Sequence, residues 1–135
     1  MSITWNEKLS VGHDLIDDQH KELFKRYDSL IDACKSGKGK AEIRPMLDFL
    51  LEYVNRHFAE EERFMLRLSY PDREEHLRQH REFLNKVTEA SAELDEKGAT
   101  VSVVTSISHT TFNWLIRHVR QTDVELGRFI VGQAA

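Results

Sequence analysis

Residues 43–68 read IRPMLDFLLEYVNRHFAEEERFMLRL, and the spacing within this stretch decides the fold. Residues that could face a core recur in alternating steps of four and three, as they do along one face of an α-helix. A proline is tolerated in the first turn of a helix, and Pro45 falls early in the predicted helix, near its first turn. The stretch therefore predicts one long helix. Its inward face comprises Ile43, Leu47, Leu50, Val54, His57, Glu61, Phe64 and Leu68.

Three further stretches carry similar spacing, and breaks at residues 36–40, 69–72 and 97–100 separate the four. Short connections imply antiparallel neighbours, so we predict an all-α, up-down-up-down antiparallel four-helix bundle. The other inward faces comprise Ile16, His20, Leu23, Tyr27, Leu30 and Cys34, then His76, His80, Phe83, Val87, Ala90 and Leu94, and then, less regularly, Val104, Ile107, Thr111, Leu115, His118, Thr122, Leu126 and Ile130.

The expected organisation is a single domain over residues 1–135. It consists of an N-terminal arm over 1–12 and helices over about 13–35, 41–68, 72–97 and 101–131. Asp72 and Glu75 have the spacing of an N-terminal capping pair, so we expect them to cap the third helix.

Composition narrows the class of protein. The 135 residues carry a net charge of −4, which argues against a nucleic-acid partner, and 40% of them are apolar, as in a globular domain. We expect no membrane span and no secretory signal. Cys34 is the only cysteine, which excludes an internal disulfide and cysteine-rich metal sites. The expected compartment is the cytoplasm.

Six inward positions hold residues that an apolar core should reject, because buried polar side chains are costly unless they are paired or bind metal. Counting from the turns places these residues at one height in the bundle: His20 lies 18 residues before position 38, and His57 lies 19 after it. This convergence predicts a metal site. The six are His20, His57, Glu61, His76, His80 and His118.

Asp123 is a less obvious candidate. It follows His118 by five residues, which is an offset of about 140° on a straight α-helix. Periodicity alone leaves it equally open to be a solvated aspartate. If Asp123 is a ligand, we expect a local distortion of the fourth helix or an approach from the side.

The number and type of donors favour two metal ions. Five imidazoles, two bridging carboxylates and one solvent bridge leave one position open on two octahedral ions, enough for a small diatomic molecule. Nitrogen and oxygen donors without thiolate suit iron or manganese, and zinc on ligand type alone. The His-Glu-x-x-His pattern of zinc proteases is absent, and no histidine follows a glutamate by three residues as in ferritin-like sites.

Four stretches together resemble the hemerythrin family, in particular its single-domain bacterial members, the bacteriohemerythrins. They are Val11-Gly12 with Ile16-Asp17-Asp18-Gln19-His20, His57-Phe58-Ala59-Glu60-Glu61-Glu62, Tyr70-Pro71 with His76 and His80, and Trp114-Leu115 with His118 and Asp123. The resemblance covers nearly the whole chain. It implies a non-haem centre of two iron ions, bridged by an oxo or hydroxo group, that binds O₂ reversibly.

The resemblance also implies a role for each candidate. His76, His80 and His118 would hold one iron, His20 and His57 the other, and Glu61 and Asp123 would bridge them. O₂ would bind at the iron with two histidines. An apolar pocket would be formed by Leu23, Phe58, Trp114, Leu115 and Val119.

The expected function is oxygen storage, transport or delivery without catalysis. Two alternatives stay open: a di-iron enzyme acting on peroxide or nitric oxide, and an O₂ or redox sensor. His13 and His109 are expected to lie away from the metal site.

Overall fold

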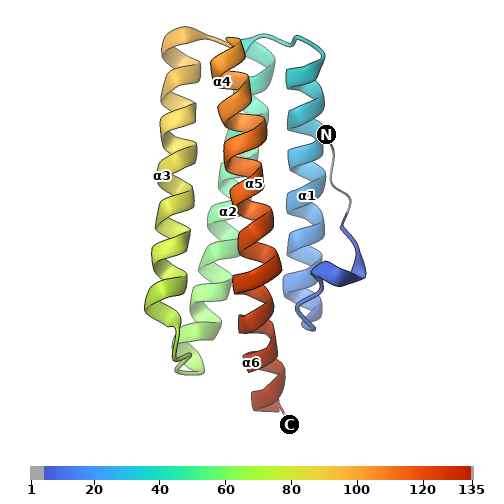
Figure 1. Ribbon diagram of the computed structural model, residues 1–135, viewed down its shortest axis with the longest axis vertical. Coiled ribbons are helices and arrows are strands. Elements are labelled where there is room, and N and C mark those ends of the chain that lie inside the picture. Colours follow the sequence, from blue (N-terminus) through green and yellow to red (C-terminus); the bar gives the residue numbers. More distant parts are fainter. Residues whose placement is uncertain (1–4, 135) are drawn as a thin grey trace.

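Four helices run side by side in alternating directions, as predicted (Figure 1). The computed structural model describes residues 5–134, and no strand occurs among them. The first three helices are α1 (Asp14–Lys35), α2 (Lys40–Arg67) and α3 (Arg73–Lys97), preceded by a 3₁₀ turn, η1 (Glu7–Leu9). None of the helices formed by residues 5–134 combines the length and the hydrophobicity that a membrane span requires.

The fourth helix is continuous but contains two π-turns. It consists of α4 (Val101–Thr105), the π-turn η2 (Ser106–Thr111), α5 (Phe112–Arg117), the π-turn η3 (His118–Asp123) and α6 (Val124–Ala134). In η2, side-chain hydroxyls donate hydrogen bonds to main-chain carbonyls: Ser108 Oγ donates to Val104 O at 2.7 Å and Thr111 Oγ1 to Ile107 O at 2.5 Å. Such bonds compete with the α-helical ladder and bend helices.

The predicted inward faces of α1 and α3 are buried at every position, whereas those of the other two helices need correction. In α2, Phe64 and Leu68 are only half-buried and Met65 lies in the core, because a 3.6-residue turn drifts away from a 3.5-residue repeat. In the fourth helix, Val103 and Asp123 are buried instead of Val104 and Thr122. The π-turn η3 shifts the inward face by one residue at Asp123, whereas Val103 precedes both π-turns and lies four residues before the buried Ile107, as on a regular α-helix.

The helix ends follow sequence signals in two cases and not in a third. Gly98 ends α3 with a positive φ of 75° and donates its N–H to Leu94 O, and Thr100 caps α4 by accepting from Val103 N–H. The predicted capping pair of α3 is wrong: the Asp72 side chain makes no capping bond. Glu75 instead accepts hydrogen bonds from Arg78.

The polar layer predicted from the sequence divides the apolar core into two clusters. The larger lies toward the α3–α4 connection and contains Leu30, Leu50, Val87 and Ile107 among others. The smaller lies at the opposite end of the bundle. It comprises Val11, Ile16, Met65, Tyr70, Leu126 and Ile130.

The N-terminal arm is tied to the bundle through Asp17. The Asp17 carboxylate accepts from Ser10 Oγ at 2.6 Å and from Val11 N–H at 2.8 Å, and its side chain is almost fully buried. Val11 then packs against α6 at Gly127, where an added Cβ would collide with the Val11 carbonyl. The arm therefore requires a residue without a side chain at position 127.

We expect Gly127→Ala to destabilise the protein by about 1–3 kcal/mol, because the added methyl overpacks the contact with Val11. The matched control is Gly132→Ala, also in α6, where an added Cβ meets nothing within 4 Å. That control should leave stability unchanged or raise it by up to about 1 kcal/mol through helix propensity. Denaturant unfolding measures both, and equal stability of the two variants would contradict the contact.

Candidate metal centre

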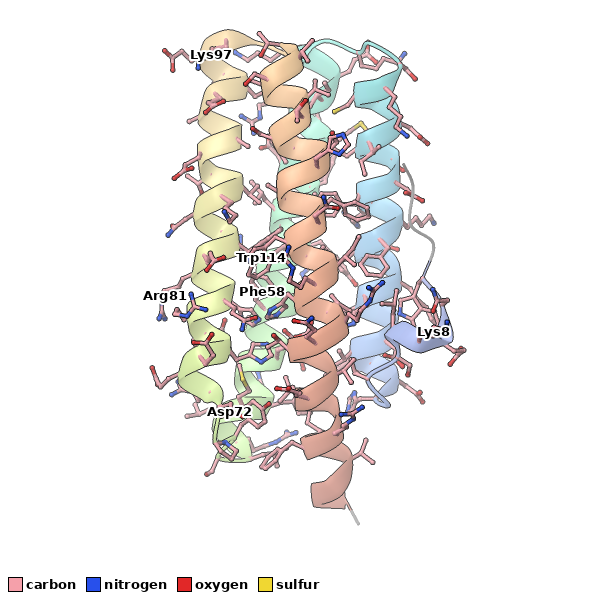
Figure 2. All side chains as sticks on the ribbon, viewed as in Figure 1. Lys8, Phe58, Asp72, Arg81, Lys97 and Trp114 are labelled. Carbon is pink, nitrogen blue, oxygen red and sulfur yellow. The ribbon has the colours of Figure 1, made fainter. Side chains whose placement is uncertain are left out.

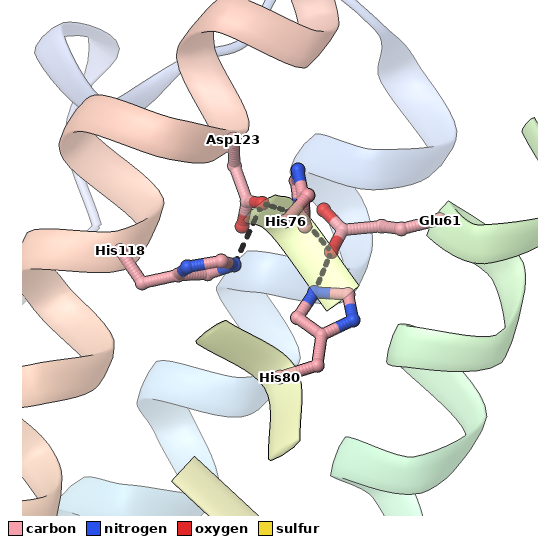
Figure 3. A group of neighbouring side chains, drawn as sticks. All are labelled: Glu61, His76, His80, His118 and Asp123. Atoms are coloured by element: carbon pink, nitrogen blue, oxygen red, sulfur yellow. Dashed lines mark hydrogen bonds and ion pairs between the residues drawn. The ribbon is translucent and has the colours of Figure 1, made fainter. Parts of the chain in front are cut away.

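The seven candidate ligands converge from all four helices into two overlapping groups. His20 lies on α1, His57 and Glu61 on α2, His76 and His80 on α3, and His118 and Asp123 at the ends of η3. One group comprises Glu61, His76, His80, His118 and Asp123, and the other His20, His57, Glu61 and Asp123. Within each group the candidate donor atoms lie within 4.8 Å of one another. Figure 3 shows the first group, with the side chains of Glu61 and Asp123 directed at the three imidazoles.

Glu61 and Asp123 belong to both donor groups, and each carboxylate directs one of its two oxygens at the histidines of one group and the other oxygen at those of the second group. Asp123 Oδ1 lies 3.1 Å from the Nε2 atoms of His76 and His118, while Oδ2 lies 2.9 Å from His20 Nε2. Glu61 Oε1 lies 3.1 Å from His80 Nε2, while Oε2 lies 3.5 Å from His57 Nε2. This is the arrangement that two bridging carboxylates require.

Several buried atoms at this point have no hydrogen-bond partner among the described residues. They are the Nε2 atoms of His57, His76 and His118, Glu61 Oε2 and Asp123 Oδ1. Leaving such groups unpaired in a dry interior is costly, and a cation between them would satisfy all five. The donor set therefore fits a metal: it is nitrogen and oxygen only, and it is inward-facing.

The π-turn η3 accounts for the spacing of His118 and Asp123. On a straight α-helix these two side chains would diverge by about 140°. The i→i+5 hydrogen bonding of a π-turn places residues five apart nearly above one another, and the two side chains meet at 3.1 Å. The fourth helix thus has the local distortion expected if Asp123 shares the site.

Electrostatics in the layer favour anionic carboxylates. Burial opposes the ionisation of Glu61, but His57, His76 and His80 outweigh it and lower its pKa to about 2. Burial likewise opposes ionisation of Asp123, whose pKa His118 and His20 nevertheless hold well below its usual range.

The imidazoles of the layer differ in their protonation. Burial lowers the pKa of His57 to about 4, so this ring is neutral and ready to bind a metal. Burial also opposes protonation of His76, yet the carboxylate oxygens of Asp123 and Glu61, 3.1 and 3.5 Å from its Nε2, raise its pKa to about 10. A proton on His76 compensates the carboxylates when no metal is bound, and a metal ion would displace that proton.

Three supporting residues escaped the sequence analysis. Gln19 accepts from His57 Nδ1–H at 2.7 Å, Glu62 from His80 Nδ1–H at 2.9 Å, and Gln79 from His118 Nδ1–H at 2.7 Å. Such bonds fix the tautomer and aim each Nε2 lone pair at the centre. Each supporting residue is the sequence neighbour of a candidate ligand but supports a histidine on the following helix. The pattern depends on helix pairing, and no single-helix periodicity could have revealed it.

The five predicted pocket residues all lie near the layer but in two settings. Leu23, Leu115 and Val119 are fully buried in the larger core cluster. Phe58 stacks on His80 with 3.7 Å between ring centroids, and Trp114 lies parallel to His118 at 5.0 Å. The two aromatic rings therefore contact the three-histidine group. The two remaining histidines belong to neither donor group: His109 is exposed and His13 packs against Phe64.

The support by Gln79 can be tested by replacing it with leucine. Gln79→Leu removes the acceptor of both His118 Nδ1–H and the Thr122 hydroxyl, so we expect metal affinity to fall about 10- to 100-fold. Anaerobic competition for ferrous ion against a chelator measures the change. Gln121→Leu is the control, since Gln121 is exposed on the same π-turn as His118. Equal affinities in the two variants would contradict the supporting role.

Comparison with known proteins agrees with this geometry. The family model described as the hemerythrin HHE cation binding domain matches residues 11–130. A bacteriohemerythrin of Campylobacter jejuni is 30% identical over 129 residues, covering 94% of this chain and 95% of the relative, and a myohemerythrin of Sipunculus nudus is 29% identical, covering 88% and 86%. A crystal structure of a leucine-to-phenylalanine mutant superposes with a TM-score of 0.84 at 26% identity, covering 95% of this chain and 96% of that one. The chain belongs to the hemerythrin family.

Proposed function

We propose that this chain binds O₂ reversibly at a non-haem di-iron centre and serves in oxygen storage, transport or delivery in the cytoplasm. His76, His80 and His118 would hold one iron and His20 and His57 the other, with Glu61 and Asp123 bridging. The names of the relatives, bacteriohemerythrin and myohemerythrin, support the proposal at the level of the family.

One observation carries the proposal: the two donor groups share both carboxylates but differ in size. One group offers five side-chain donors and the other offers four. With one solvent bridge, two octahedral ions would be filled except for a single position on the two-histidine side. Two ferrous ions held there would supply the two electrons that reversible O₂ binding uses.

The remaining residues keep the centre dry and its ligands fixed. Leu23, Leu115 and Val119 have no exposed surface, and Phe58 is 2% exposed. An apolar lining disfavours the separation of charge that accompanies irreversible oxidation. Gln19, Glu62 and Gln79 hold three of the imidazoles in the ligating tautomer, so little rearrangement is needed when a metal enters.

The central experiment is an iron assay combined with anaerobic optical spectroscopy. The reduced protein should contain two irons per chain, and an O₂-dependent visible band should appear on addition of O₂ and disappear on its removal. Zinc, or one ion per chain, would contradict the dinuclear centre. Rapid turnover of peroxide or nitric oxide in place of a stable band would instead favour the enzymatic alternative.

The ligand assignment is tested in the same assay by His118→Ala. This variant should lose bound iron and the reversible band, because the three-histidine iron loses one donor. His109→Ala is the control, since His109 is an exposed histidine of the same helix. Retention of the reversible band by the His118 variant would refute the assignment.

Bound iron should also stabilise the fold, because seven buried polar side chains lose their common partner without it. At free ferrous ion 100-fold above its Kd, anaerobic unfolding should require about 2.7 kcal/mol more than in the metal-free chain. Thermal or denaturant unfolding with and without chelator measures the difference. An identical unfolding midpoint in both conditions would show that the ion does not bind the folded layer.

A further inference from the structure

Trp114 connects the protein surface to a candidate ligand through one aromatic ring. The half-buried indole on α5 lies parallel to the His118 imidazole, with 5.0 Å between centroids and 12° between planes. The same His118 ring directs its Nε2 inward, 3.1 Å from Asp123 Oδ1. Figure 2 places Trp114 at mid-height of the bundle, on the side of α5 that faces α3.

A carboxylate holds the indole in this orientation. Trp114 Nε1–H donates to Glu82 Oε1 at 2.7 Å, and Arg78 donates to Glu82 Oε2 at 3.0 Å. The bond from Trp114 and, to a smaller extent, the bond from Arg78 lower the pKa of Glu82, so the Glu82 side chain is an anion at neutral pH. Phe83 packs against the indole as well, at 5.0 Å between centroids. The ring is thus held from α3 both by packing and by a charge-assisted bond.

The surface around Trp114 is basic, although the chain is acidic. Three adjacent hollows all include Glu82: residues of α3 and the fourth helix line two of about 180 and 370 Å³, and residues of α3 alone line the third, of about 410 Å³. Their lining contains four cationic side chains against Glu82 and Glu89, and with Glu75, which pairs with one of the four, the local charge is +1 on a chain of net charge −4. We call this surface the basic furrow, and its cations are Arg78, Arg81, Lys86 and Arg117.

Three of these cations are available to a partner. Arg78 is engaged by Glu75 and Glu82, but Arg81, Lys86 and Arg117 form no ion pair with any described residue of the chain. An acidic protein would be repelled by the net charge of the chain and attracted at the basic furrow, which would orient it toward Trp114.

We propose that the basic furrow docks an acidic one-electron carrier protein, and that the stacked rings of Trp114 and His118 form the path by which the carrier's electron would reach the iron held by His118. This inference rests on the proposed function, since a di-iron centre that has become diferric must be reduced before it can bind O₂ again. In each encounter the carrier would lose one electron and one ferric ion would become ferrous, so two encounters would restore the diferrous centre, with an oxo bridge taking up a proton from water. No bond in the chain forms or breaks.

Docking is tested by binding alone. The probe is a plant-type [2Fe–2S] ferredoxin, an acidic one-electron carrier, with both proteins oxidised so that no electron moves. We expect Arg81→Glu combined with Arg117→Glu to raise the Kd at least about tenfold, and added salt to weaken the wild-type complex. The control is Lys25→Glu combined with Arg128→Glu, which changes the net charge by the same amount at exposed positions on α1 and α6 and should weaken binding less. Equal weakening by both pairs would overturn the docking site.

The electron path is tested by stopped-flow reduction of the iron-loaded diferric chain with reduced ferredoxin. Trp114→Leu should lose the fast phase, whereas Trp114→Phe, which keeps a ring against His118, should retain it. Rates are compared per bound iron and at saturating ferredoxin, so that a change in iron content or in ferredoxin affinity cannot imitate loss of the path. A fast phase that survives in the leucine variant would overturn the path. Failure of wild type to hold two irons would refute the proposed function instead, while the binding experiment would still decide the docking site.

Discussion

Seven titratable side chains share one dry layer of the bundle, and the rest of the structure is arranged around the cost of placing them there. None of the seven is more than 3% exposed. Taking carboxylates and imidazoles out of water is unfavourable unless each finds a partner. The carboxylates take imidazoles as partners, three imidazoles take acceptors on neighbouring helices, and the atoms left over all face one point. A cation at that point completes the set.

The layer also determines how the apolar core is distributed. It separates a large cluster around Leu50 and Val87 from a small one around Met65 and Tyr70. The small cluster contains six buried side chains, with five partly buried hydrophobic side chains packed against them. Asp17 and Gly127 supplement it, because they fasten the N-terminal arm to α1 and α6.

Much of this arrangement could be predicted from the sequence, because helical periodicity fixes which residues face inward and turn positions fix their heights. His20, His57 and His80 needed no more than this arithmetic. Asp123 needed more: it is buried only because η3 adds a residue to one turn, and the sequence indicated the distortion solely through the five-residue spacing. The supporting residues Gln19, Glu62 and Gln79 could not be found in this way. Each bonds to a histidine on another helix, and periodicity does not specify how two packed helices are rotated relative to each other. The first π-turn was missed although a Thr-Ser-Ile-Ser-His-Thr-Thr run precedes Phe112 and supplies the hydroxyls that compete for carbonyls.

The three supports follow the order of the chain: α1 supports a histidine of α2, α2 one of α3, and α3 one of the fourth helix. Each of the first three helices therefore contributes in two ways: it carries metal donors of its own, and it orients a histidine donor on the next helix. A helix exchanged between relatives would carry its donors with it but leave its successor's imidazole facing an unmatched neighbour. Amino-acid replacement at a supporting position is consequently constrained by a histidine of the next helix rather than by residues of its own helix. Recombination within the bundle preserves the centre only when adjacent helices are inherited as pairs.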